Sequence, residues 1–292
     1  MSLDRIAILS PGDMGHAVGR ALVERGARVV TTLDGRSVAT RERARRAGIE
    51  DLGSLQAAVE ASDLVLSILP PAAALELART AVPALGQAGH RVLYADCNAV
   101  SPATAGSMAT LVADAGAEFI DVGIVGPPPG RGPDTRFYAS GSAAERLREL
   151  DAPGVEVRVI GSEVGRASAL KMVYAGLTKG TLTLYTAVLV AAERLGLSRE
   201  FARELGESQA TALDRMRRVP FLPADAGRGI GEMDEIARTV RDAGVTPGVH
   251  EGAGWIFRLM ERTPYASETR ETLDRTRTLE EAVRTFAREL GP

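Results

Sequence analysis

The sequence predicts an α/β protein whose first half is a doubly wound parallel sheet and whose second half is entirely helical, joined by one long helix. Three observations support this. Short β-rich runs alternate with helical periodicity up to residue 160, a glycine-rich turn follows the first run, and the β pattern is lost after Gly161. Such alternation favours parallel strands with right-handed crossovers. We therefore expect one domain over residues 1–162 and an all-helical domain over residues 163–292.

The elements follow in order along the chain. Strands are expected at residues 5–9, 28–33, 64–69, 91–96 and 118–122. Helices are expected between them at residues 14–25, 39–47, 55–61, 73–85 and 102–115. Two more strands, at residues 136–140 and 155–160, follow a Gly/Pro-rich loop and close the sheet. Helices then cover residues 164–195, 199–218, 230–242, 249–261 and 278–290, with a break marked by Pro220, Pro223 and Gly227.

Length and composition limit the classes of protein to which the chain can belong. The 292 residues suffice for two domains, and 45% hydrophobic with 25% charged residues is typical of soluble globular chains. The longest apolar run is shorter than a membrane span, and the N-terminus lacks a signal-peptide pattern. Cys97 is the single cysteine, and a net charge of -3 provides no basic field for nucleic acid. We expect a cytoplasmic protein without a structural metal, a membrane anchor or a nucleic-acid partner.

A dinucleotide-binding fingerprint follows the first strand. The segment Ser10-Pro-Gly12-Asp13-Met14-Gly15 opens the first helix, and its glycines allow a tight turn in which helix amides receive a pyrophosphate. Ser10 stands where the usual pattern has its first glycine. The position between first strand and first helix supports the assignment, so Gly12, Asp13, Met14 and Gly15 are predicted to bind the dinucleotide. The alternative is an ordinary glycine-rich turn.

About 20 residues further on, the second strand ends where the adenosine ribose is bound in such folds. Asp34 there suits the ribose hydroxyls of NAD, whereas Arg36 and Ser37, followed by Arg41, suit the additional phosphate of NADP. NADP is favoured over NAD. A turn of solvent-exposed residues is the alternative interpretation.

Two more segments end strands at the carboxyl edge of the sheet, where open α/β sheets bind ligands. Leu69 and Pro70 follow the third strand, and Asn98 follows the fourth. These three residues are predicted to contact the cofactor. We expect the Asn98 amide to face the nicotinamide or its ribose, within reach of the substrate.

One lysine lies in an otherwise apolar helix of small residues. From Ala167 to Ala192 nearly every position around Lys171 is Ala, Gly, Leu, Val, Thr, Met or Tyr. A buried ammonium is costly unless it is paired or its pKa falls, and a lysine with a lowered pKa transfers protons. A lysine whose stem packs while its head reaches water is the alternative.

The order of these parts resembles the β-hydroxyacid dehydrogenase family, which includes 3-hydroxyisobutyrate and 6-phosphogluconate dehydrogenases, over residues 5–192. The resemblance implies a Rossmann domain, an interdomain helix and Lys171 as the acid/base group, preceded by the glycine-rich lead of residues 161–165. The segments 171–180 and 231–237 are similar to a bacterial subgroup whose C-terminal domain was long described as of unknown function.

Three positions depart from the family pattern. Ala175 stands where the family has an asparagine one turn after the lysine, and residues 125–127 stand where it has a carboxylate-binding Ser-Gly-Gly, leaving Gly126 as an N–H donor beside Pro127. Glu232 and Met233 stand where the family has a Lys-Asp pair. We therefore expect a substrate that is not bound like a simple 3-hydroxy acid.

The function that follows is hydride transfer between a nicotinamide and a hydroxyl-bearing carbon of a small hydroxy acid. Neutral Lys171 accepts the alcohol proton, which requires its pKa to fall from the ordinary value of about 10.4. Tyr174 is a candidate hydrogen-bond donor or a packed aromatic ring. Lys179 is a candidate for binding a substrate anion or a lysine at a subunit surface. Glu232 is a candidate substrate contact or a solvated helix residue.

Two other functions stay open. An imine reductase uses the same architecture, and the altered carboxylate segment favours it, whereas Lys171 argues against it. A nucleotide-binding module without catalysis is the other, since a fold does not determine function. The long apolar helix needs cover on most faces, so a homodimer is expected.

Overall fold

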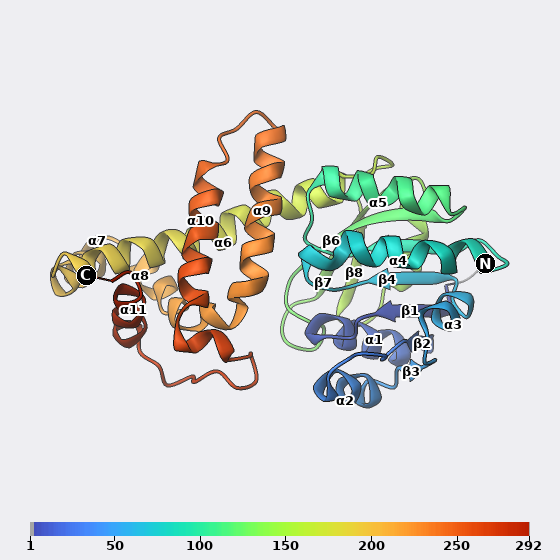
Figure 1. Cartoon of the computed structure of the whole chain (residues 1–292), viewed down its shortest axis with the longest axis horizontal. Helices are drawn as coiled ribbons and strands as arrows, with labels where there is room; N and C mark the ends of the chain where they lie inside the picture. The colour runs from blue at the N-terminus through green and yellow to red at the C-terminus, as the bar shows by residue number, and fades with distance from the viewer. Residues whose placement is uncertain (1–2, 292) are drawn as a thin grey trace. The chain divides into compact units, whose positions relative to one another are not determined.

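The computed structural model of the chain describes residues 3–291 and divides into two compact units, Met1–Met172 and Val173–Pro292 (Figure 1). The division falls inside helix α6 (Arg166–Arg194), whereas the sequence analysis placed a boundary before this helix. The difference has a physical reason, because the first turns of α6 are hydrogen-bonded to the sheet of the first unit. Each unit is described separately below.

The first unit is built on one eight-stranded sheet of order β3-β2-β1-β4-β5-β6-β7-β8. The strands are β1 (Arg5–Leu9), β2 (Arg28–Thr31), β3 (Glu50–Asp51), β4 (Leu64–Ser67), β5 (Leu93–Asp96), β6 (Glu118–Val125), β7 (Thr135–Ser140) and β8 (Val155–Val159). All neighbours are parallel except β6 and β7. The order from β3 to β6 is that of the Rossmann fold, in which the strand order reverses between β1 and β4 while the strands stay parallel. The expected α/β class is confirmed.

Helices cover both faces of this sheet. They are α1 (Asp13–Glu24), α2 (Val38–Arg46), α3 (Leu55–Glu60), α4 (Ala74–Gln87) and α5 (Pro102–Asp114). Successive residues of β1 face opposite layers: Ile6 and Ile8 pack with α1 and α2, whereas Ala7 and Leu9 pack with α3, α4 and α5. Strands buried on both faces read as continuous apolar runs, as these do.

Most strand ends lie within two residues of the sequence expectation, and two elements differ more. Strand β3 was not predicted, because its two acidic, exposed residues carry no β pattern and are placed by backbone pairing with β2. Strand β6 was predicted to end at Val122 but continues to Val125, because it gains the antiparallel partner β7. In both cases the extent of the strand is determined by backbone pairing with a neighbouring strand and not by the side-chain pattern of the strand itself.

The second unit is helical. Besides the rest of α6 it contains α7 (Ser198–Ser208), α8 (Ala210–Met216), α9 (Ala226–Asp242), α10 (Gly248–Glu261) and α11 (Leu279–Arg288). The single helix expected at residues 199–218 is two helices, because the backbone turns at Gln209. The expected break is a 3-10 turn over Val219–Asp225, and Gly227 lies inside α9. Helices α9 and α10 pack closely, since a methyl group on Gly229 would come within 2.6 Å of the Phe257 ring.

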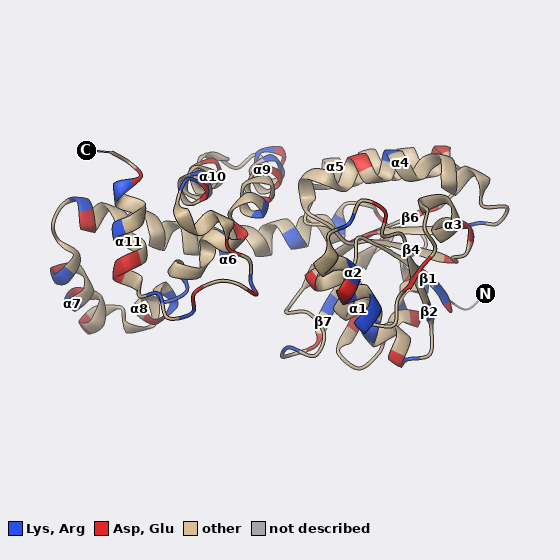
Figure 2. Cartoon of the chain, turned by 60° about the horizontal axis from the view of Figure 1, so that its bottom comes forward, with Lys and Arg blue, Asp and Glu red and all other residues tan. Residues whose placement is uncertain are grey.

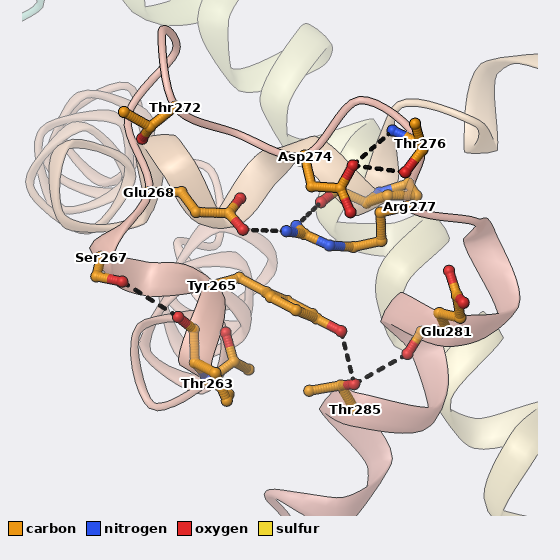
Figure 3. A network of polar contacts seen from close by, with 12 residues as sticks. Thr263, Tyr265, Ser267, Glu268, Thr272, Asp274, Thr276, Arg277, Glu281 and Thr285 are labelled. Atoms are coloured by element: carbon orange, nitrogen blue, oxygen red, sulfur yellow. Dashed lines mark hydrogen bonds and ion pairs between the residues drawn. The ribbon is translucent and has the colours of Figure 1, made fainter.

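A buried arginine anchors the long connection between α10 and α11 (Figure 3). The Arg277 side chain is 5% exposed and forms an ion pair with Glu268. It donates from Nη1 to the Pro220 carbonyl at 2.9 Å, and its guanidinium lies 3.5 Å from the centre of the Tyr265 ring. A side chain that donates to two separate partners and also stacks on an aromatic ring suits arginine and not lysine. This cluster fixes a segment that has little helix of its own.

Helix α6 is long and apolar enough to cross a membrane by length and composition alone. Because no uninterrupted apolar run reaches the length of a membrane span, the sequence did not predict this property of α6. One such helix is weak evidence, because the core helix of a globular protein passes the same test. Figure 2 shows acidic and basic residues interspersed on the helices of both units.

Candidate active site

The fingerprint loop between β1 and α1 has the backbone that a dinucleotide requires. Ser10 has a φ of 66°, and within residues 3–291 no other non-glycine residue has a positive φ. This conformation explains why the pattern normally has glycine here. A methyl group on Gly15 would come within 2.9 Å of the Ser10 carbonyl oxygen, so the helix can begin this close only with glycine. Gly12 has no side chain to cap α1, so the amides of its first turn face a potential ligand.

Two side chains of the first turn of α1 have partners. His16 Nδ1 lies 2.6 Å from the Gly12 carbonyl oxygen. Asp13 forms an ion pair with Arg131 at 2.8 Å, and Arg131 comes from the loop between β6 and β7. Met14 packs partly buried against the core on the α1 side of the sheet. The shape of the fingerprint loop is therefore stabilised by contacts within the protein. Such a preformed loop is compatible with a pyrophosphate site built from backbone amides.

The predicted adenosine end lies in the turn between β2 and α2. Asp34 is exposed and Arg36 half-buried. Ser37 begins α2, because its hydroxyl accepts a hydrogen bond from the Thr40 amide at 3.2 Å. Arg41 donates to the Arg36 carbonyl at 3.2 Å. The two cationic side chains thus share one short turn with the carboxylate of Asp34.

Asn98 is engaged within the protein. Its amide nitrogen donates to Ser67 Oγ at 2.9 Å and to Asp96 Oδ1 at 2.6 Å, and its oxygen accepts from the Leu69 amide at 2.7 Å. The side chain therefore links the loops after β4 and β5, with Leu69 half-buried and Pro70 exposed at that edge. Sequence reasoning anticipated the place of Asn98 but not these internal bonds.

Asp96 is fully buried beneath this link. Burial raises the pKa of its carboxyl to about 7, although bonds from Asn98 and Ser67 favour the charged form. The carboxyl therefore titrates near neutrality, inside the polar cluster that shapes the sheet edge. No role was predicted for Asp96 from the sequence. The feature that could have indicated one is an acidic residue at the end of an apolar strand.

A second buried carboxylate anchors the start of the helix that carries Lys171. Asp121 on β6 is fully buried and accepts hydrogen bonds from Ser140 Oγ at 3.1 Å and Ser168 Oγ at 2.6 Å. It also accepts from the amides of Gly165 at 2.8 Å and Ser168 at 3.0 Å. Four donors compensate a buried carboxylate, and a helix N-terminus adds a favourable dipole. Asp121 was not predicted from the sequence. The feature that could have identified it is a single acidic residue inside an apolar strand.

Gly123, two residues further along β6, lets the helix approach the strand. A methyl group there would lie 2.7 Å from the Ala167 carbonyl oxygen and 2.9 Å from Lys171 Cβ. No real Cβ tolerates such distances without a shift of its neighbours. Lys171, which is half-buried, is therefore fixed against the carboxyl half of β6 by a glycine on the strand and a carboxylate that caps its helix.

Gly126 ends β6 with a φ of 123°, a conformation that favours glycine. A methyl group there would come within 3.3 Å of the Asp134 carbonyl oxygen. Thr135 donates to the Pro127 carbonyl at 2.6 Å and closes the base of the loop. Val125 and Pro127 on either side carry no hydroxyl, so backbone groups are the polar contribution of residues 125–127.

In the second unit, Lys179 on α6 and Glu232 on α9 form an ion pair. The Glu232 side chain is fully buried, and Arg228 Nε lies 3.8 Å from the same carboxylate oxygen. Burial lowers the pKa of Lys179, against the opposing effect of Glu232. The Tyr174 side chain is 45% exposed. Lys179 and Glu232 were predicted separately as substrate contacts, and their pairing was not foreseen.

Substitution of Lys179 by methionine is expected to destabilise the protein by about 3 kcal/mol, because the buried Glu232 carboxylate loses its ion pair with Lys179. The double variant Lys179→Met/Glu232→Leu is expected to recover most of this loss, since no buried charge remains. Urea denaturation of the two variants measures the difference. Equal stabilities of the single and double variants would contradict this account of the pair.

No metal centre is found among residues 3–291, where no cluster of three or more His, Cys, Asp or Glu side chains is close enough to hold an ion. Glycine turns, open helix amides and a cation-bearing turn after β2 suit a dinucleotide cofactor.

Comparison with known proteins agrees with this geometry. Residues 5–150 match the NAD binding domain of 6-phosphogluconate dehydrogenase, and residues 192–260 match a domain of unknown function, DUF1932. An uncharacterized 28.5 kDa protein of Methanothermus fervidus is 30% identical over 207 residues, which cover 70% of this chain and 77% of that protein.

Solved structures share the fold. A conserved protein of unknown function, described as similar to 3-hydroxyacid dehydrogenases, is 30% identical with a TM-score of 0.64, over 88% of this chain and 96% of that chain. A Mycobacterium tuberculosis 3-hydroxyisobutyrate dehydrogenase with L-serine is 19% identical with a TM-score of 0.70, over 98% and 99%. An imine reductase from Myxococcus stipitatus with NAD+ is 18% identical with a TM-score of 0.57, over 99% and 100%.

The predicted resemblance and the NAD(P) cofactor are therefore confirmed. The chain belongs to the hydroxyacid dehydrogenase family, with an NAD-binding domain of the 6-phosphogluconate dehydrogenase type followed by a C-terminal DUF1932 domain.

Proposed function

We propose that the protein is an NAD(P)-dependent dehydrogenase that moves a hydride between the nicotinamide and a hydroxyl-bearing carbon of a small hydroxy acid. The observation that carries this proposal is the position of the Lys171 backbone and Cβ against β6, between the Asp121 cap and the close approach at Gly123. A lysine whose backbone is held beside the carboxyl half of a sheet strand suits a proton-transfer group.

The bound nicotinamide supplies the hydride acceptor or donor. The Lys171 amine accepts the hydroxyl proton during oxidation, and its ammonium returns a proton during reduction. Asp121 keeps the first turn of α6 in place during this exchange. We assign the pyrophosphate to the amides of Gly12, Asp13, Met14 and Gly15. The Asn98 link keeps Leu69 and Pro70 in position at the sheet edge.

Substrate binding is assigned to four residues besides Asn98. The Gly126 amide and the Tyr174 hydroxyl donate hydrogen bonds, and Lys179 binds an anionic or hydroxylated group while the buried Glu232 holds its ammonium in place. NADP is preferred to NAD, with Arg36 and Ser37 at its phosphate and Asp34 at the ribose. We place this activity in the cytoplasm, acting on a small molecule without nucleic acid or membrane.

A panel of hydroxy acids, alcohols and cyclic imines with both cofactors tests the proposal through the nicotinamide absorbance. We expect turnover of a hydroxy acid, faster with NADP. Turnover of imines alone would instead support an imine reductase, which is favoured by the absence of hydroxyl side chains at Val125 and Pro127. Cofactor binding without turnover of any of these compounds would support a non-catalytic module.

We also propose a homodimer built on α6. Leu170, Val173, Leu177 and Leu184 recur at helical spacing on one face and are 39%, 63%, 70% and 59% exposed. Apolar stripes of this length are normally covered in soluble proteins.

The double substitution Leu177→Asp/Leu184→Asp is expected to shift the protein from dimer to monomer, because two carboxylates would be buried in an apolar interface. Light scattering after size exclusion measures the mass. Val245→Asp, on a side chain 57% exposed outside α6, serves as the control and should leave the dimer intact. A monomeric wild type, or a dimer that tolerates both aspartates, would contradict the assignment.

A further inference from the structure

The loop over residues 126–133 is attached to α1 by two contacts in the first unit. Arg131 Nη1 lies 2.8 Å from Asp13 Oδ1. At the preceding residue, a methyl group on Gly130 would come within 3.1 Å of Arg20 Nη2, so α1 and the loop touch there as well. The Arg131 amide donates to the Pro128 carbonyl at 3.1 Å, which makes the loop a tight turn aimed at the start of α1.

The acidic partner occupies an unusual place for a residue at a phosphate site. Asp13 is the first residue of α1, where the helix dipole favours a carboxylate. The same dipole and the same first-turn amides are what bind a pyrophosphate. A carboxylate beside two phosphates repels them, so a cation is needed to offset it. Arg131 is the cation that the structure provides there.

Arg131 also has the capacity to bind a second anion. Its side chain is 50% exposed, and the ion pair with Asp13 uses Nη1, one end of a guanidinium that carries five N–H donors. Guanidinium groups bind phosphate oxygens bidentately. The base of the loop is closed by the bond from Thr135 to the Pro127 carbonyl, and Arg131 already lies beside the first residue of α1.

We propose that Arg131 binds the pyrophosphate of the dinucleotide, with Asp13 as a competing partner that holds the guanidinium ready beside the first turn of α1. The proposal rests on the dinucleotide site assigned above and not on the role of Lys171. It gives the Gly/Pro-rich loop a function in cofactor affinity. The proposal also gives Arg131 and Arg36 different roles. Arg131 binds the pyrophosphate, which NAD and NADP share, whereas Arg36 binds the additional phosphate, which only NADP carries.

The test measures affinities by nicotinamide fluorescence for NADH and NADPH, and by calorimetry for ADP-ribose. Arg131→Met is expected to weaken all three by the same factor, about 10-fold to 100-fold, since a charge-assisted bond to phosphate is lost. Arg131→Lys should retain part of the affinity. Asp13→Asn is expected to strengthen binding by about 2-fold or more, because the competing negative charge is removed.

Arg148→Met is the matched control, since Arg148 forms a similar surface ion pair with Glu145 in the same unit. Unchanged affinity in Arg131→Met would overturn the proposal. A loss in Asp13→Asn equal to that in Arg131→Met would also overturn it, because the pair would then be only a structural latch. Should Arg131→Met fail to fold, the other two variants still test the proposal. Arg131→Lys is expected to lower the affinity and Asp13→Asn to raise it. A wild type that binds none of the three ligands would refute the dinucleotide site itself.

Discussion

Replacement of Lys171 by methionine is expected to lower kcat by about 10²-fold to 10⁴-fold, the usual contribution of a general acid/base group. Methionine keeps the length and apolar contacts of the lysine stem and removes only the amine. The cap at Asp121 involves helix amides and the Ser168 hydroxyl, and the approach at Gly123 involves the Ala167 carbonyl and Lys171 Cβ, so neither should change. Steady-state kinetics with the best hydroxy acid of the panel measures the effect.

Cofactor affinity is the internal control for this variant. It should match the wild type, because Lys171 is not part of the fingerprint loop or of the turn after β2. Turnover by Lys171→Met at the wild-type rate would refute the assigned role. A loss of both turnover and NADPH affinity would instead show that Lys171 acts in cofactor binding.

Substitution of Gly123 by alanine is expected to have the second-largest effect. The new methyl group would meet the Ala167 carbonyl oxygen at 2.7 Å and Lys171 Cβ at 2.9 Å. Both belong to a helix that is tied to β6 through Asp121, so the helix must shift or the strand must bend. Overpacking of this kind costs about 1–3 kcal/mol. A displacement of Lys171 by about 1 Å is expected to lower kcat by about 100-fold.

Gly106→Ala is the control for this substitution. Gly106 lies in α5, and nothing comes within 4 Å of a methyl group placed there. This variant should keep full activity and gain slight stability, because alanine is the better helix former. The measurements are the thermal midpoint and kcat of both variants. Wild-type values for Gly123→Ala would show that the contact between β6 and α6 does not position the lysine.

Local patterns predicted most of the architecture. The alternation of strands and helices, the fingerprint after β1 and the long helix with Lys171 all depend on neighbours within a few residues, so they are visible in the sequence. Strand β3 was missed because its backbone pairing with β2 defines it and its side chains do not. The turn at Gln209 was missed because neither proline nor glycine marks it.

The contacts that complete the candidate site are non-local. Asp121 caps a helix 47 residues later, and Lys179 pairs with a glutamate 53 residues away. Asp13 and Arg131 meet only because β6 leads its loop back to α1. Residue types suggested that such groups were functional candidates, but partners of this kind depend on the packed fold. Asn98 illustrates this, since its position was foreseen and its three internal bonds were not.

The most direct test of the central claim is single-turnover reduction or oxidation of nicotinamide with the best hydroxy acid, compared between wild type and Lys171→Met across pH. The account predicts rapid hydride transfer in the wild type, governed by one ionisation that disappears in the variant while cofactor binding persists. Equal rates and an identical pH profile in the two proteins would contradict it.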